Sequence, residues 1–275
     1  MSEPEARGEQ EMAAPLRALL MRLYRDPRYL LIGTVERHGR EQLSFIESCS
    51  VFSAAGEMRG QLLLNQEYER RGRPDGERPY GRESLLDYYL SLAAAGDRQL
   101  EEEEVTALRE ESWQYYVRRN FAFQLRDYAQ ARDDAEHNLG IWNLVEQSSA
   151  SEEEKWSYLK WWPWIERDRA VAQALLDLQD GEREQAAAEL YRADRSIRQF
   201  GARCAEHYQR EEGDNQTICS AMQQHLQALI ELLRQEEGLP VSLEERLDQA
   251  DARGDEGEVQ RLRAEMIRRA MPEPE

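Results

Sequence analysis

The chain has very little lysine, and this shortage limits the chemistry that it can perform. Lys155 and Lys160 are its two lysines, so arginine supplies nearly all of the 36 basic residues. A phosphate-binding loop needs a lysine directly after a glycine, and neither lysine has that neighbour. The signature motifs of protein kinases fail for the same reason. Since the rest of the sequence shows no other catalytic signature, we expect a protein without catalytic activity.

Cysteine is also scarce. Cys49, Cys204 and Cys219 are an odd number of thiols with no C-x-x-C pair, which argues against a disulfide framework and favours a reducing compartment. The first residues are acidic and polar, unlike a secretory signal. Apolar runs fall short of the roughly 20 residues that a membrane helix requires. We expect a cytoplasmic protein with no membrane association.

The balance of charge is strongly acidic. The chain holds 36 basic and 55 acidic residues, which gives a net charge of -19. Such a surface repels phosphate at long range, so binding to nucleic acid would need a local basic patch. The densest arginine clusters, at 70–82 and 261–269, are interleaved with acidic residues or lie in an acidic segment. Direct binding to nucleic acid is therefore not expected.

Helical periodicity dominates the chain from residue 83 onward. Leu190 and Ile197, for example, belong to a long stripe of apolar residues spaced three or four apart. The sequence predicts an all-α fold of stacked antiparallel helical hairpins. We expect a disordered tail at 1–12, a helical body at 13–236 and a separate helical hairpin at 240–271.

Residues 28–66 are ambiguous. Leu31 and Val35 suit a strand, and a turn after them would give a small β-hairpin. The apolar residues from Phe45 onward also recur at helical spacing. Because short apolar runs fit both patterns, we favour a helix from about Glu41 and keep the β-hairpin as the alternative.

Four tryptophans occur within nine residues, at Trp156, Trp161, Trp162 and Trp164. Core packing is the simpler interpretation, since aromatic side chains dominate the energetics of burial. The alternative is an aromatic groove that binds a partner, with Trp161 and Trp164 as contacts. Adjacent tryptophans on one helix cannot both face the same core, so at least one should be partly exposed.

The histidines and cysteines offer one metal-like grouping, formed by Cys204, His207, Cys219 and His225. The first two are three residues apart, a spacing that places them on one helix face. The last two are six apart and point to different faces, whereas zinc sites use tighter pairs. An enzyme or metal-binding protein using these four residues is the alternative to a non-catalytic protein. We expect no cofactor.

The stretch LEERLDQADARGDEGEVQRLRAEM, at 243–266, has the start and stop signals of two short helices. Ser242 and Glu245 form a capping box at the first start. Gly254 suits the position after a helix end, where a positive φ is needed. Asp255 can then cap the second helix.

The apolar edge of this hairpin comes from Leu247, Val259, Leu262 and Met266. Helices of about ten residues are marginal alone in water. We therefore expect the hairpin to complete its core with the body, with a second copy of itself, or with a partner.

Two breaks in the body resemble the turn and second helix of tetratricopeptide repeats. The matching residues are Asp127, Tyr128, Ala131 and Leu139 in one copy and Gly181, Ala186 and Ala193 in the other. The copies are farther apart than the roughly 34-residue repeat. The resemblance implies stacked helical hairpins of irregular length.

The terminal hairpin resembles the UVR motif, which the UvrB and UvrC nucleotide-excision-repair proteins share with some Clp-type chaperone ATPases and with the activator of the bacterial protein-arginine kinase. The matching residues are Leu247, Ala250, Asp255, Val259 and the Leu262-Arg263 pair. Glu256, Gly257 and Ala264 depart from the pattern. The resemblance implies a bacterial protein whose hairpin contacts another protein, helix against helix.

These observations predict a non-catalytic scaffold or adaptor. Its contacts would be Leu247, Val259, Leu262, Arg263 and Met266 in the hairpin, and Trp161 and Trp164 in a helical groove. Helix-in-groove recognition is the expected mode, and the hairpin could also serve self-association. A further alternative, implied by the resemblance, is an accessory factor in DNA repair or regulated proteolysis.

Overall fold

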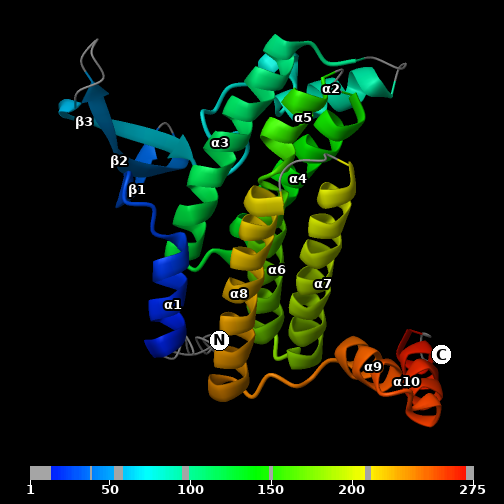
Figure 1. The fold of residues 1–275 in the computed structure, drawn as a ribbon. Coiled ribbons are helices and arrows are strands. Elements are labelled where there is room, and N and C mark those ends of the chain that lie inside the picture. The colour runs from blue at the N-terminus through cyan, green and yellow to red at the C-terminus, as the bar shows by residue number, and fades with distance from the viewer. Residues whose placement is uncertain are drawn as a thin grey trace, which may run out of the picture.

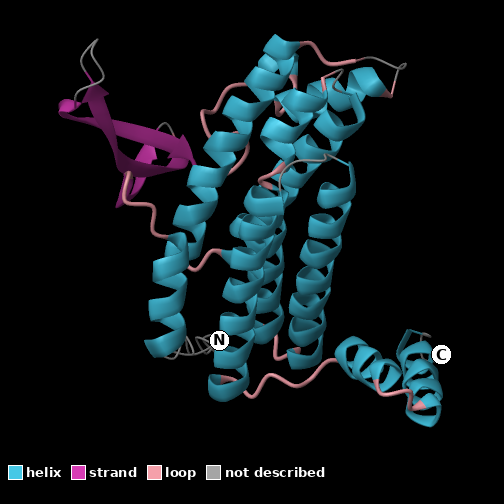
Figure 2. Cartoon of the chain, in the orientation of Figure 1, coloured by secondary structure: helices cyan, strands magenta, loops and turns pink. Residues whose placement is uncertain are grey.

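The computed structural model describes residues 14–37, 39–52, 58–94, 99–148, 151–207 and 212–270. The predicted disordered tail at 1–12 lies outside these residues. The described chain is mostly helical, and one small sheet stands beside the helices (Figure 2). The predicted all-α class therefore holds for most of the described chain, and the small sheet is the exception.

The bounds of the elements are as follows. The helices are α1 (Ala14–Tyr24), α2 (Leu85–Ala93), α3 (Glu102–Gln124), α4 (Tyr128–Ser148), α5 (Glu152–Leu159), α6 (Trp162–Gln179), α7 (Arg183–His207), α8 (Glu212–Glu236), α9 (Leu243–Ala252) and α10 (Glu256–Ala270). The strands are β1 (Tyr29–Arg37), β2 (Arg40–Phe52) and β3 (Met58–Glu69), and a short 3-10 turn covers Pro79–Gly81.

Five long helices form the body. In the order α3, α4, α6, α7 and α8, each helix packs against the next (Figure 1). Helix α1 packs against both α3 and α8, so it bridges the two ends of this series. Tyr24 of α1 stacks on Phe123 of α3 with ring centroids 3.6 Å apart. Helix α1 therefore covers one side of the five-helix series. In an open array of helical hairpins, that side would face solvent.

Small residues let the helices of the body approach closely. Ala131, Ala186 and Ala193, which carry the tetratricopeptide resemblance, are all completely buried in the main core. At Gly140 of α4, an added Cβ would lie 2.7 Å from Cδ2 of Leu86. Helix α2 therefore rests directly on the backbone of α4.

The three strands form an antiparallel sheet in the order β1-β2-β3. Leu43 and Phe45 are two residues apart, so they share a face of β2, and they pack with Val117 and Phe121 of α3 in a core of their own. The helix favoured from about Glu41 is therefore wrong. The β-hairpin alternative is confirmed and gains a third strand, because pairing with both neighbours satisfies the backbone of β2.

Helices α9 and α10 form the terminal hairpin, which lies at the end of the body in Figure 1. Ser242 Oγ accepts from the backbone N–H of Glu245 at 3.2 Å, which is one half of the predicted capping box, while the Glu245 carboxylate accepts from Arg234 and Gln249. Gly254 has a φ of 69°, and Asp255 Oδ1 accepts from the N–H of Glu258 at 3.0 Å. The N-cap bonds of both helices and the glycine turn between them are confirmed.

Candidate ligand pocket

A pocket of about 570 Å³ lies between α3 and α6, a volume typical of small-molecule sites. Its lining residues are Arg109, Ser112, Trp113, Tyr116 and Arg119 from α3, Asn138 from α4, Tyr158 from α5, Trp161, Trp164 and Ile165 around the start of α6, and Arg28 just before β1. The residues from α3 recur at helical spacing. One face of α3 therefore supplies nearly half of the lining.

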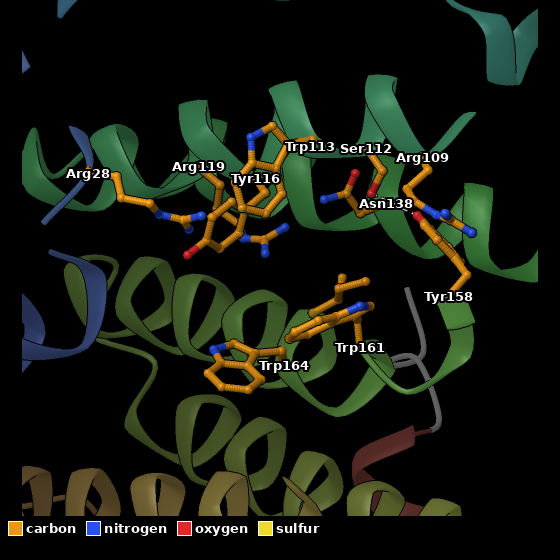
Figure 3. Close-up of a pocket in the computed structure, with 11 residues that line it drawn as sticks. Arg28, Arg109, Ser112, Trp113, Tyr116, Arg119, Asn138, Tyr158, Trp161 and Trp164 are labelled. Carbon is orange, nitrogen blue, oxygen red and sulfur yellow. Dashed lines mark hydrogen bonds between the residues drawn. The ribbon is translucent and has the colours of Figure 1, made fainter. Parts of the chain in front are cut away.

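Aromatic rings form two opposing walls of the pocket (Figure 3). Trp113 and Tyr116 of α3 lie on one side, with ring centroids 4.9 Å apart. Trp161 and Trp164 lie on the other side, 5.8 Å apart. Trp113 and Trp161 remain 43% and 46% exposed. Large rings left open to solvent in a concave site favour the binding of another flat apolar group.

Arginines supply the charge of the pocket. Arg28 donates to Asp26 at 2.5 Å, whereas Arg109 donates to the neutral Ser157 Oγ at 2.7 Å. Arg119 is the third cation. Among the described residues, no aspartate or glutamate lines the pocket, although acidic residues outnumber basic ones in the chain. The charged side chains of the lining are therefore all cations, although Arg28 and Arg119 are ion-paired with Asp26 and Asp168, and a cationic lining attracts anions.

Arg119 is held by a buried network of charges. Its side chain is 1% exposed, and its Nε donates to Asp168 Oδ2 at 2.9 Å. The other oxygen of Asp168 accepts two bonds from Arg167, at 3.0 and 2.5 Å. Burial opposes the charge on Arg167, and Asp168 outweighs it, so the pKa of Arg167 is raised. One carboxylate thus serves two buried guanidinium groups, which leaves an excess of positive charge.

Among the described residues, two buried polar atoms of side chains that line the pocket lack a hydrogen-bond partner. These atoms are Nη1 of Arg119 and Oδ1 of Asn138, and both side chains are almost completely buried. A buried polar atom without a partner costs about 1–3 kcal/mol, and more when the group is charged. A ligand with an acceptor for Arg119 and a donor for Asn138 would offset this cost.

Ser112 and Tyr158 add a neutral polar edge beside Asn138 (Figure 3). The hydroxyl of Tyr158 donates to Ser112 Oγ at 2.7 Å. Burial raises the pKa of Tyr158 well above its ordinary value, so this hydroxyl stays protonated at neutral pH. Cationic donors, hydroxyls, an amide and flat rings can together bind and orient a ligand.

The four clustered tryptophans divide between the core and the pocket. Trp156 is buried in the main core, and Trp162 packs against it, stacked on Phe200 at 4.8 Å. Trp161 and Trp164 line the pocket. The core interpretation is therefore confirmed for Trp156 and Trp162, while the binding of a partner by Trp161 and Trp164 stays a prediction.

The predicted contact residues of the hairpin have different surroundings. Val259 and Leu262 are buried in a small core between α9 and α10, and Leu247 and Met266 are partly buried against it. Arg263 is exposed. Since Val259 and Leu262 of α10 already pack against Leu243 and Ala250 of α9, a partner would reach them only after the hairpin opened.

The four residues of the metal-like grouping do not form one cluster in the described structure. Cys204 and Cys219 are buried between α7 and α8, and burial, reinforced by the neighbouring Cys219, raises the pKa of Cys204 to about 12. Nδ1 of His225 lies 3.0 Å from Nη1 of Arg167 instead. The side chain of His207 lies outside the described residues. Within the described ranges, no group of three histidine, cysteine or acidic side chains is suited to a metal ion.

Sequence reasoning missed most of the pocket. The signal lay in α3, where Arg109, Ser112, Trp113, Tyr116 and Arg119 follow helical spacing with no small aliphatic residue among them. A helix face made only of cationic, aromatic and hydroxyl side chains suits a binding surface better than a core. The partner wall on α6 is about fifty residues away, and only the fold brings it opposite.

The fold and the pocket define a mostly helical protein with a cavity lined by arginine and tryptophan. No family model matches the chain, and neither a curated protein nor a solved structure matches it. In the described part of the chain, no helix is long and apolar enough to span a bilayer. The resemblances to the UVR motif and to tetratricopeptide repeats therefore stay predictions, and the functional argument depends on the geometry.

Proposed function

We propose that this protein is a non-catalytic binding protein whose pocket takes a small anionic ligand that carries a flat ring. The observation that supports this most directly is Arg119, a buried cation with an unpartnered Nη1 in a pocket with aromatic walls. A guanidinium group pairs well with carboxylate or phosphate oxygens. We keep cytoplasmic residence as part of this proposal.

The proposal is tested by a pair of ligands with the same ring and different charge. Indole-3-acetate and indole-3-acetamide differ mainly in the carboxylate. A hydrogen bond to a charged group contributes about 1.5–3 kcal/mol, so the acetate should bind at least about tenfold more tightly. Calorimetric titration of the full chain measures both affinities. Equal affinities, or no binding of either compound, would contradict the proposal.

Matched variants show whether binding occurs in this pocket. Trp161→Ala removes a ring from the wall and should weaken the acetate by about tenfold, a typical loss for a stacking side chain. Tyr80→Ala removes another exposed ring outside the pocket and should leave the affinity unchanged. Equal losses in both variants would place the binding elsewhere.

The adaptor predicted from the sequence is a second candidate function, because the terminal hairpin has its own core. Leu243, Ala250, Val259 and Leu262 form a cluster separate from that of the body. Polar contacts join the hairpin to α7, including Tyr191 to Asp248 at 2.7 Å. A hairpin that has its own core and contacts the body through polar side chains is suited to act as a separate binding module.

The adaptor is tested on the exposed side of α10. Ile267 is 63% exposed, and Arg263 is exposed one turn earlier. Proteins captured by the full chain should be lost both with Ile267→Asp and with a chain ending at residue 239. A control variant, Met58→Asp, changes an exposed apolar residue of the sheet and should retain them. Capture that survives without residues 240–275 would refute the adaptor role.

A further inference from the structure

The lining of the pocket indicates further chemical groups of the ligand, besides its negative charge. Its arginines and its neutral polar edge are different recognition elements, and both line the pocket (Figure 3). Arg119 offers an unpartnered donor, and Asn138 offers an unpartnered acceptor. One ligand that satisfies both atoms must carry acceptor oxygens and an N–H or O–H donor.

The charge favours a ligand with more than one negative oxygen. Arg28, Arg109 and Arg119 all line the pocket, while a simple carboxylate is satisfied by one bidentate guanidinium group. A phosphate carries up to two charges and three terminal oxygens. Arg28 and Arg119 also lie over the rings of Trp113 and Tyr116, at 4.9 and 5.5 Å, so cations and rings line the same wall.

The amide favours a ring that has hydrogen-bonding groups on its edge. Oδ1 of Asn138 can only accept, and it lies in a buried place without a donor. An exocyclic amino group of a purine supplies such a donor, and an asparagine side chain pairs well with an adenine edge. A plain aromatic anion would leave this oxygen unsatisfied.

The size and the walls fit the same class of ligand. A cavity of about 570 Å³ is too roomy for inorganic phosphate alone and lies within the usual range for small-molecule sites. Trp113 and Trp161 present rings from opposite walls, and nucleobases stack on such rings. The net charge of -19 repels a long polyanion more strongly than a single nucleotide.

We infer that the pocket binds a free purine nucleoside phosphate that carries an exocyclic amino group. This inference rests on the proposed function and names its ligand class. The rings of the two walls hold the base, Asn138 accepts from the amino group, and Arg119 with a second arginine of the lining binds the phosphate.

The inference is tested by titrating the full chain with adenosine monophosphate, adenosine, purine riboside monophosphate and inorganic phosphate. Adenosine monophosphate should bind with one site per chain. Adenosine, which lacks the phosphate, and the purine riboside phosphate, which lacks the amino group, should each bind at least about tenfold more weakly. Inorganic phosphate should bind more weakly than all three.

Asn138→Leu isolates the role of the amide. Leucine has a similar size and no polar atom, so the variant should fold, and a thermal melt verifies this. In the variant, the adenosine and purine riboside phosphates should bind with the same affinity, because the acceptor is gone. A preference for the amino group that persists in Asn138→Leu would overturn the inference.

The remaining outcomes separate this inference from the proposed function. If the nucleotide fails to bind and indole-3-acetate binds, the ligand class is wrong and the anion pocket stands. If neither binds, both proposals fall. Tighter binding of a five-nucleotide oligoadenylate than of adenosine monophosphate would overturn the choice of a free nucleotide.

Discussion

Arg119 and Asp168 form a buried ion pair between α3 and α6, with Arg119 Nε donating to Asp168 Oδ2 at 2.9 Å. The same carboxylate also accepts from Arg167. The pair therefore joins the two helices that form the walls of the pocket. It fixes Arg119 in place and leaves its Nη1 without a partner.

Asp168→Asn should destabilise the fold strongly. The change leaves Arg119 and Arg167 buried without a compensating charge, and breaking a buried pair in this way costs about 3–5 kcal/mol. The free energy of unfolding, measured with urea, tests this. Asp133→Asn is the control, because its pair with Arg132 is largely exposed and should contribute less than about 1 kcal/mol. Similar losses in the two variants would contradict the assigned role.

His225 should make the fold sensitive to acid. Burial, followed by the nearby charges of Arg167 and Arg22, lowers the pKa of His225 below its ordinary value of 6.5, although Asp168 opposes the shift. As the pH falls, the unfolded chain therefore binds this proton first. The stability contributed by neutral His225 is present above the unfolded pKa and is lost as the pH falls from there through the lower folded pKa.

The His225→Gln variant removes this titration and keeps an acceptor for Arg167. Its melting temperature should fall less than that of the parent chain between about pH 7.5 and pH 5.5, the range in which histidine changes charge. Thermal melts at constant ionic strength test this. Parallel losses in both proteins would show that His225 does not contribute to the acid sensitivity.

Phe45→Ala should detach the sheet from α3. Phe45 is 1% exposed and packs against Phe121 with ring centroids 4.9 Å apart. Truncating a buried phenylalanine costs about 3–5 kcal/mol. Hydrogen exchange should therefore accelerate in β1–β3 before it accelerates in α6 and α7. Leu63→Ala, at an exposed position of β3, should change neither region.

Leu262→Asp should unfold the terminal hairpin and leave the body intact. Leu262 is 0% exposed within the separate core of α9 and α10, and burying an unpaired charge there is prohibitive. Limited proteolysis should cut within 243–270 while a fragment that contains α3–α8 persists. If a denaturant titration shows the body and the hairpin unfolding at the same denaturant concentration, the hairpin is an integral part of the stack.

The sequence predicted the features that depend on near neighbours. Ser242, Gly254 and Asp255 each act within three residues of themselves, and their caps and turn appear as predicted. The long helices also follow from local periodicity. The sheet could not be predicted in the same way, because Phe45 is held in a strand by β1, β3 and α3 rather than by its neighbours in the chain.

The pocket was harder still to predict from the sequence, because it depends on residues that are far apart in the chain. Trp161 and Trp164 stood out in the sequence because they are rare and clustered. Arg119 did not, since its importance comes from burial, from the shared carboxylate of Asp168 and from the wall across the pocket. Only the packing of α3 against its neighbours shows that an acidic chain forms a pocket whose charged lining residues are arginines.

Titration of Arg119→Gln with indole-3-acetate and indole-3-acetamide tests the central claim most directly. The variant leaves Asp168 paired with Arg167, so the fold should persist, and circular dichroism verifies this. We expect the parent chain to favour the charged compound by at least about tenfold and the variant to bind both alike. A preference for the acetate that survives in Arg119→Gln would contradict the claim that this buried arginine receives the ligand's charge.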